Sequence, residues 1–213
     1  PSLLEEALKK NPDTKLVVAT HAETSTGVKQ NIQELGKIVS KYDAMFMVDC
    51  VTSLAGTELL FDSWGIDFAY SGSQKCLASP PGLSPCALSN RAYEYIRNRT
   101  KKPSSWYLDL SLVNDYWGKD HIPQYTVAVS SIYGLYESLR LLEEEGIEER
   151  WTRHIHNADK LRKGLMELNI NLPISEKDRL DQLTVLTKPN HIDDVEFRNR
   201  LINDYSIEIG RGL

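Results

Sequence analysis

The feature that most constrains the fold of this chain is a pair of short apolar runs with a helix-like segment between them. Residues 15–20 read KLVVAT and residues 44–48 read AMFMV, and each run has the length of one strand buried on both faces. Between the runs, apolar side chains recur at the spacing of one helix face, at Ile32, Leu35, Ile38 and Val39. Strand, helix and strand in this order predict an α/β fold with a mainly parallel central sheet flanked by helices.

Further segments continue this pattern along the chain. We expect a short helix capped by Ser2, then strands and longer helices. The expected strands are residues 66–70, 83–88, 182–187 and 206–209, and the expected helices are residues 130–145, 148–168 and 193–201. Gly146 interrupts two helical patterns, so we place a domain boundary there. Residues 1–146 would form one domain, and residues 147–213 a smaller α+β domain that is cut short.

Charge and composition narrow the class of partners. The 213 residues carry a net charge of −5, whereas proteins that bind nucleic acid usually have a basic balance. We interpret the one basic cluster as a solvated helix end; it comprises Arg97, Arg99, Lys101 and Lys102. No apolar run is long enough to span a membrane, and the three cysteines have no metal-ligand spacing and form no CxxC. We therefore expect a cytoplasmic protein without a metal site. Organelle targeting stays open, because the chain starts at Pro1 rather than Met and both termini look incomplete.

Three polar clusters follow expected strands. They are HAETSTG at residues 21–27, DCVTS at residues 49–53 and SGSQK at residues 71–75. In open α/β sheets, ligands bind in the crevice beyond the carboxyl ends of the strands. These clusters are therefore the candidate functional residues.

Asp49 and Lys75 carry the most specific chemistry in these clusters. A carboxylate at the end of a buried strand needs a partner, such as a protonated ring nitrogen, although Asp49 could equally cap the next turn. Lys75 follows small residues that let a ligand approach the backbone, although alone it reads as a surface lysine. Together they match the two fixed needs of pyridoxal phosphate, an acid for the pyridinium nitrogen and a lysine for the aldehyde. Val51 would share a face with Asp49 in an extended chain.

Four stretches resemble one known family and cover nearly the whole chain. They are HAETSTGV (21–28), FMVDCVTSLAGT (46–57), DFAYSGSQKCLASPPGLSP (67–85) and PQYTVAVSSIYGLYESL (123–139). They look like the alanine–glyoxylate and serine–pyruvate aminotransferases, which are class V pyridoxal-phosphate enzymes of the aspartate aminotransferase fold. The resemblance implies a fragment: residues 1–146 would be the C-terminal part of the large cofactor-binding domain, and residues 147–213 a truncated small domain.

The resemblance also implies a role for particular residues. Lys75 would form the Schiff base with the cofactor and shuttle protons, and Asp49 would bind the pyridine nitrogen. Val51 would pack under the ring, Thr24 would lie near the phenolic oxygen and the substrate, and Gln74 would touch the phosphate.

Family members are dimers with a shared active site, so a homodimer is expected. Thr126, with Tyr125 beside it, matches the place where the partner subunit reaches the phosphate. Some members carry a tyrosine three residues before that threonine, whereas this chain has Pro123, so the Tyr125 contact is left open. The phosphate-cradling loop and the ring-stacking aromatic would precede residue 1. The arginine that grips the substrate carboxylate would follow residue 213, and Arg211 falls too early to be assigned that role.

The implied reaction is transamination between a small amino acid, alanine or serine, and a 2-oxo acid, glyoxylate or pyruvate. Other donors of the same class, such as ureidoglycine, aspartate or hydroxykynurenine, remain open, as does an inactive fragment that serves only in binding or assembly. A nucleotide-binding protein is disfavoured because neither GxGxxG nor GxxxxGK[ST] occurs. A cysteine desulfurase is disfavoured because Gln74, not histidine, precedes Lys75. His21 is interpreted as structural rather than as a base.

Overall fold

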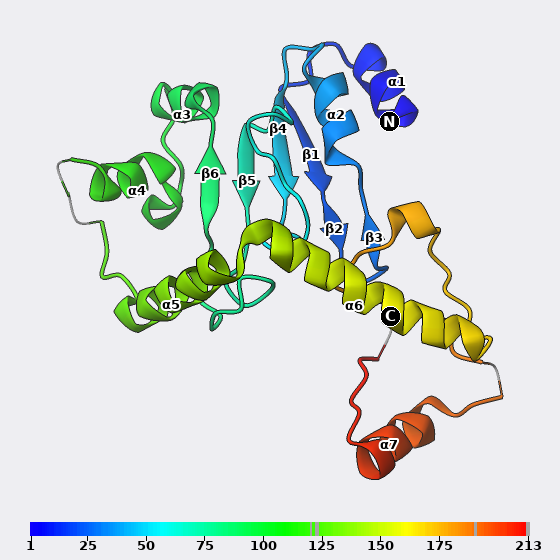
Figure 1. Ribbon diagram of the computed structural model, residues 1–213. Coiled ribbons are helices and arrows are strands. Elements are labelled where there is room, and N and C mark those ends of the chain that lie inside the picture. Colours follow the sequence, from blue (N-terminus) through cyan, green and yellow to red (C-terminus); the bar gives the residue numbers. More distant parts are fainter. Residues whose placement is uncertain (120, 122–123, 190, 212–213) are drawn as a thin grey trace.

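The computed structural model describes residues 1–119, 121, 124–189 and 191–211 (Figure 1). Its α-helices are α1 (Ser2–Lys10), α2 (Ile32–Val39), α3 (Asn90–Arg97), α4 (Leu110–Trp117), α5 (Val129–Glu145), α6 (Ile147–Glu167) and α7 (Asp194–Tyr205). Its strands are β1 (Leu16–Thr20), β2 (Ala22–Glu23), β3 (Val28–Lys29), β4 (Met45–Asp49), β5 (Phe68–Tyr70) and β6 (Cys86–Leu88). None of the helices in these described ranges is long and apolar enough to cross a membrane.

The main sheet confirms the predicted α/β fold. Its strand order is β1-β4-β5-β6, in which β1, β4 and β5 run parallel and β6 is antiparallel to β5. The register pairs Thr20 with Asp49 and Asp49 with Tyr70, so these three residues lie in one row at the carboxyl ends of the parallel strands. The polar composition of residues 21–27 predicts a loop, but this stretch contains β2, which pairs with β3 in a short antiparallel hairpin.

The hydrophobic core lies on one face of this sheet. Alternate strand residues Val17, Phe46, Val48 and Ala69 are buried there against the apolar face of α2. The side chain of Asn31 begins that helix by accepting a hydrogen bond from the backbone N–H of Glu34 at 3.1 Å. A Cβ on Gly36 would lie 1.9 Å from the carbonyl oxygen of Trp64, so only glycine lets α2 pack this closely.

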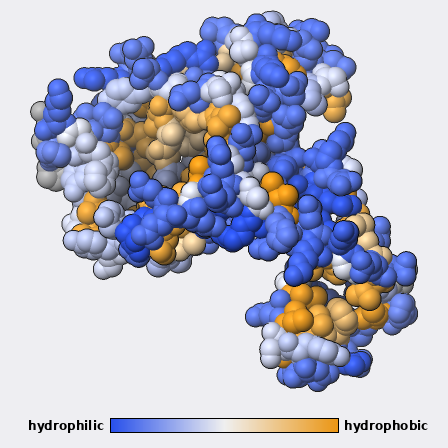
Figure 2. Space-filling view, viewed as in Figure 1, coloured by the Kyte–Doolittle hydropathy of each residue, from blue (hydrophilic) through white to orange (hydrophobic). Residues whose placement is uncertain are grey.

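The opposite face of the sheet is open, which corrects the expectation that the first two strands are buried on both faces. Leu16 is 49% exposed and Val18 is 57% exposed, while Met45 and Met47 are only half-buried. The reason is that α1 and α2 pack their apolar residues on the other face. Figure 2 shows apolar side chains gathered in a hollow around β5 and β6.

Two helical predictions need correction. Ser2 is the first residue of α1 rather than its cap, and Pro1 in the cap position supplies no side-chain hydrogen bond. On α5 the helical spacing predicts that Ile132, Leu135, Leu139 and Leu142 face inward, but Leu139 is 46% exposed and the buried residue is Ser138. The small residues of α5 turn inward because they let the helix approach the segment at Ser79 and Pro80, which lies within van der Waals reach of Gly134.

The strands expected at residues 182–187 and 206–209 are absent. Both segments are irregular, because among the described residues neither finds a neighbouring strand to complete a ladder. Thr187 donates one backbone hydrogen bond to Asn171 at 2.9 Å, and an isolated bridge joins Arg179 to Val28. α5 and α6 meet at Gly146, whose φ of 85° is accessible to glycine. The division into domains at this residue stays a prediction.

Candidate active site

Asp49 lies at the carboxyl end of β4, directly beside Tyr70 of β5. Its Oδ2 accepts a hydrogen bond from the Tyr70 hydroxyl at 2.7 Å. This bond, together with burial, raises the pKa of Tyr70 to about 12. Sequence reasoning missed Tyr70, although the parallel register of the two strands is the signal that would have found it.

The second carboxylate oxygen of Asp49 holds the turn that follows the strand. Oδ1 accepts the backbone N–H of Val51 at 2.9 Å, so the turn-capping alternative for Asp49 is realised. Val51 lies in this turn, and the expected extended chain from Asp49 to Val51 is therefore wrong. Each carboxylate oxygen can accept about two hydrogen bonds, so Asp49 keeps acceptor capacity for a further donor such as a ring N–H.

The loop that carries Lys75 is held by buried serines. The Ser73 hydroxyl donates to the carbonyl of Pro80 at 2.6 Å and accepts the N–H of Leu83 at 3.3 Å. The backbone N–H of Ser79 closes the loop on the Ser73 carbonyl at 3.0 Å. Ser71 Oγ reaches across to the carbonyl of Cys50 at 3.3 Å, so this loop is also attached to the strand end that carries Asp49.

Lys75 projects from this rigid loop with an exposed side chain. No hydrogen bond or ion pair joins its amine to another described residue, which leaves the amine accessible to an aldehyde. Gln74 is exposed as well, and its amide lies so close to Gly72 that a Cβ there would be 2.8 Å from Gln74 Oε1. The loop thus presents two consecutive polar side chains to solvent over a buried base.

Short contacts join the three polar clusters that the sequence placed at strand ends. Thr24 Oγ1 lies 2.5 Å from Thr52 Oγ1, and Cys76 Sγ donates to the carbonyl of Thr52 at 3.3 Å. The backbone N–H of His21 donates to the Asp49 carbonyl at 2.9 Å. Thr24, Asp49 and Lys75 therefore lie on loops that form one connected edge. Thr52 is a second member of the site that the sequence argument missed.

Thr126 is not brought to this edge by any contact among the described residues. It is exposed, in the segment that leads into α5. Its neighbour Tyr125 packs on Tyr107, with ring centroids 5.0 Å apart. Pro123, on which the expectation about the neighbouring tyrosine depended, lies outside the described residues.

His21 is buried within the protein rather than presented to a substrate. Its ring packs edge-on against Trp64 with centroids 5.9 Å apart. Burial, reinforced by the charge of Lys29, lowers the pKa of His21 to about 4. A neutral, enclosed imidazole of this kind agrees with the structural interpretation of His21.

The cysteines near the site are poor nucleophiles. Burial and the neighbouring charge of Asp49 raise the pKa of Cys50 to about 12. Burial also raises the pKa of Cys76, against the opposing charges of Arg150 and Lys75. Because the thiolate is the reactive form of cysteine, neither thiol is activated for desulfuration chemistry.

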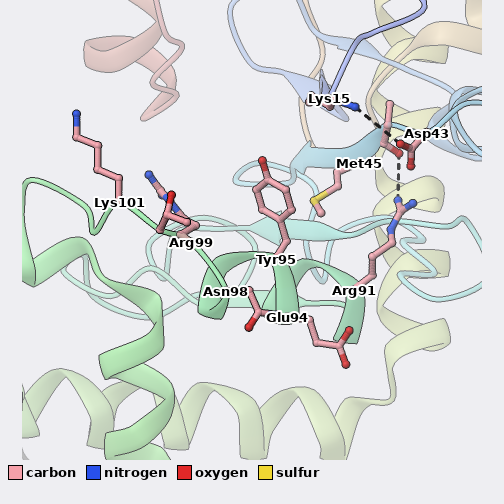
Figure 3. Close-up of a pocket in the computed structure, with 11 residues that line it drawn as sticks. Lys15, Asp43, Met45, Arg91, Glu94, Tyr95, Asn98, Arg99 and Lys101 are labelled. Carbon is pink, nitrogen blue, oxygen red and sulfur yellow. Dashed lines mark hydrogen bonds and ion pairs between the residues drawn. The ribbon is translucent and has the colours of Figure 1, made fainter.

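A cavity of the described residues lies elsewhere. It has a volume of about 740 Å³ and is lined by residues at the amino ends of β1 and β4 and by the end of α3. In Figure 3, Tyr95 rises from α3 between Arg99 and Met45, while Arg91 points toward the Asp43 side of the cavity. Parallel strands present their carboxyl ends at the opposite edge of the sheet, so this cavity is separate from Asp49.

Comparison with known proteins places this site in a family. The class-V aminotransferase family model matches residues 1–212. An uncharacterised aminotransferase of Methanocaldococcus jannaschii is 40% identical over 212 residues, which are 100% of this chain and 55% of that protein. The crystal structure of an alanine–glyoxylate aminotransferase from Nostoc sp. superimposes with a TM-score of 0.93 at 37% identity and covers 100% of this chain and 56% of that one.

A second structure is equally similar. The ureidoglycine–glyoxylate aminotransferase of Bacillus subtilis has a TM-score of 0.94 at 33% identity, over 100% of this chain and 55% of that one. The chain thus spans about half the length of the relatives it matches. Class-V aminotransferases are pyridoxal-phosphate enzymes, and the strand-end aspartate and loop lysine described above suit that cofactor. The resemblance found in the sequence is therefore confirmed, and the chain belongs to the class-V aminotransferase family.

Proposed function

We propose that the protein carrying this chain is a pyridoxal-phosphate-dependent transaminase that moves an amino group from a small amino acid to a 2-oxo acid. The observation that carries the proposal is the connected edge of the sheet, where Asp49 ends β4 and Lys75 follows the neighbouring parallel strand β5. Thr52 contacts both Thr24 and Cys76 and so links the loops of this edge. An acidic partner and an accessible amine on one rigid edge are what this cofactor requires of a protein.

In this proposal each residue keeps a distinct task. When bound, the cofactor supplies an aldehyde that condenses with amines and a ring that withdraws electrons. The Asp49 carboxylate, which Tyr70 and the Val51 N–H hold in place, would accept the ring N–H. Lys75 Nζ would hold the cofactor and would carry a proton at the substrate α-carbon, a general acid–base contribution of about 10²–10⁴-fold.

The remaining proposed contacts are less direct. Thr24 would donate toward the phenolic oxygen and the substrate, Val51 would pack under the ring, and Gln74 would bind the phosphate. Thr126, which lies apart from this edge, would serve the partner subunit's site in a homodimer. These roles are supported by the family membership and, for Thr24, by its contact with Thr52.

The favoured substrates are alanine or serine as donor and glyoxylate or pyruvate as acceptor. The similarity to the Nostoc alanine–glyoxylate enzyme supports this choice. Ureidoglycine is the second candidate donor. The Bacillus subtilis enzyme named as a ureidoglycine–glyoxylate aminotransferase is equally similar in structure. Glyoxylate is the acceptor named for both, so it is the acceptor to test first.

The test of the cofactor site is covalent trapping in the full natural chain that carries this sequence. The protein is incubated with pyridoxal phosphate, reduced with borohydride and mapped by peptide mass spectrometry. We expect a reduced adduct on the peptide containing Lys75, its loss in Lys75→Ala and its retention in Lys101→Ala. An adduct that is absent from the wild type, or equally present in Lys75→Ala, contradicts the assignment and favours a binding or assembly module.

The substrate choice is tested on the same protein by absorbance. The cofactor band should shift on addition of alanine and return on addition of glyoxylate. If ureidoglycine shifts the band and alanine does not, the second candidate replaces the first. If neither donor shifts a band that trapping has shown to involve Lys75, the donor lies outside both groups.

A further inference from the structure

Arg150 is a buried cation at the junction of the two longest helices. It lies in the first turn of α6, and its backbone N–H donates to the carbonyl of Gly146 at 3.0 Å. The residue is only 9% exposed. Removing a guanidinium from water costs free energy that must be offset by hydrogen bonds or ion pairs. Its contacts therefore show which part of the molecule this arginine serves.

The shortest side-chain contact of Arg150 is with the loop that carries Lys75, residues 73–80, here called the lysine loop. Arg150 Nη2 donates to the backbone carbonyl of Cys76 at 2.8 Å, across 74 positions of the chain. Nη1 faces Glu145 Oε2 at 3.6 Å, and Nε is buried without a hydrogen-bond partner among the described residues. Glu145 thus supplies the ion pair, and the Cys76 carbonyl accepts the side-chain hydrogen bond of Arg150.

The position of this carbonyl bears directly on Lys75. Cys76 follows Lys75 in the chain, and its carbonyl lies one peptide beyond the peptide that joins the two residues. Because peptide units are planar, fixing this carbonyl restricts the torsions through which the Lys75 Cα–Cβ bond can swing. The other end of the loop is closed by Ala78, whose N–H donates to the Lys75 carbonyl at 2.8 Å.

The hydrogen bonds that hold the lysine loop have two origins. Those that involve Ser73, Ser79 and Thr52 lie within the loops that follow the strands of the sheet. Two others come from the helices that meet at Gly146. Ser138 Oγ of α5 lies 3.1 Å from the carbonyl oxygen of Ala78 and 2.9 Å from that of Gly134, and Arg150 of α6 donates to the carbonyl of Cys76. Of these two, only the hydrogen bond from Arg150 is charge-assisted, which is the stronger kind.

We infer that Arg150 is a positioning residue for Lys75: through the Cys76 carbonyl it fixes the lysine loop relative to α6. The inference rests on the proposed role of Lys75 as the cofactor lysine. A merely structural arginine would stabilise α6 without restraining residues 73–80 in particular, so the test must separate these two effects.

Arg153 supplies a matched control on the same helix. It also pairs with Glu145, with Nη2 at 3.0 Å from Oε2, but its side chain is 49% exposed and forms no hydrogen bond or ion pair with the described residues 73–80. Replacing either arginine by methionine removes one charge from α6 and one partner from Glu145. Only Arg150→Met also frees the Cys76 carbonyl.

The experiment compares wild type, Arg150→Met, Arg150→Lys and Arg153→Met in the full natural chain without added cofactor. Hydrogen–deuterium exchange is measured on peptides covering residues 73–80 and, as an internal reference, residues 32–39. In Arg150→Met we expect the Ala78 and Ser79 amides to exchange about tenfold faster, which corresponds to about 1.4 kcal/mol. Exchange in residues 32–39 should stay unchanged. Arg150→Lys should recover part of the protection, and Arg153→Met should match the wild type.

A second readout follows the amine itself. The rate of covalent trapping of pyridoxal phosphate on Lys75 is measured as a function of pH in the same four proteins. We expect a slower rate and a displaced pH profile in Arg150→Met, with partial rescue by Arg150→Lys. Equal exchange and equal pH profiles in Arg150→Met and Arg153→Met would overturn the inference, even if Arg150→Met lowers the melting temperature.

The two proposals fail in different ways. If Lys75 is not the cofactor lysine, the wild type yields no adduct at Lys75, whatever the exchange of the loop. If Arg150 does not position the loop, the wild-type adduct forms normally and exchange of residues 73–80 is the same with and without Arg150. If Arg150→Met does not fold, Arg150→Lys must still show faster exchange than Arg153→Met for the inference to stand.

Discussion

Two segments of this protein reverse what their amino acids suggest at first sight. Residues 71–80, which are mostly small or polar, form a loop in which Ser71 and Ser73 are buried and hydrogen-bonded. Residues 179–187, with a strand-like run, form no strand and are attached mainly around Leu180. The difference teaches that local order here depends on the partners available: the polar loop is hydrogen-bonded along its length, whereas the strand-like run lacks a neighbouring strand and is attached mainly at its start.

The attachment of the second segment is compact. Leu180 is fully buried, its N–H donates to Gly27 at 3.0 Å and its carbonyl accepts from Arg162. Asp181 lies 3.0 Å from Lys29 Nζ and 3.7 Å from Arg162 Nη1. The buried Leu180 side chain and a small charge network thus attach this segment, although it forms no ladder of strand hydrogen bonds. The comparison can be tested by weakening each segment in turn.

The largest effect is expected for Leu180→Ala. Removing a fully buried leucine side chain should lower the free energy of unfolding by about 2–5 kcal/mol, through lost burial and the cavity left behind. Chemical denaturation checks this value, with Leu168→Ala as control because Leu168 is 73% exposed. A loss below that of the control would mean that residues 179–187 are held by their charges alone.

Acid should weaken the hairpin to which this segment is attached. Since the folded-state pKa of His21 is about 4 and its ordinary value is 6.5, protonation favours the unfolded state. The full stability is present above about pH 6.5 and should fall as the pH drops toward 4, by at most about 3 kcal/mol. Denaturation midpoints in this window check the slope. His21→Asn should flatten it, and the exposed control His156→Asn should not.

Ser73→Ala tests whether the polar loop depends on its hydroxyl groups. The change removes the donor to Pro80 and the acceptor for Leu83, so we expect a loss of about 1–3 kcal/mol in the free energy of unfolding. Ser63→Ala is the control, because Ser63 is exposed and its hydroxyl makes only a long 3.5 Å contact with Leu60. Equal stabilities of the two variants would remove the distinction between the lysine loop and an ordinary surface loop.

The smallest effect is expected for Tyr70→Phe. It removes one hydrogen bond to Asp49 and should cost about 1 kcal/mol of stability. It should also weaken cofactor binding, measured by titration of absorbance, because the carboxylate loses one of its two holding groups. Tyr133→Phe, at an exposed position on α5, should change neither quantity. An unchanged affinity in Tyr70→Phe would show that the Val51 N–H alone orients Asp49.

The sequence predicted most of what depends on neighbours along the chain. The parallel strands, the long helices around Gly146 and the polar strand ends with Asp49, Lys75 and Thr24 could be predicted because apolar periodicity and strand ends are local signals. Tyr70 and Arg150 could not, because their roles depend on strand register and on a contact across 74 positions. The predicted strands at residues 182–187 and 206–209 were wrong for the same reason, because a strand forms only where a neighbouring strand completes its hydrogen bonds.

The open face of the sheet has a consequence for the colloidal behaviour of this chain. Leu16 and Val18 stand exposed side by side with half-buried methionines of β4, and β1 is an outer strand of the described sheet. Contiguous apolar surface and an unpaired strand edge both promote self-association. Solubility of the isolated chain should therefore be limited by this surface. Additives that shield apolar surface should therefore extend it.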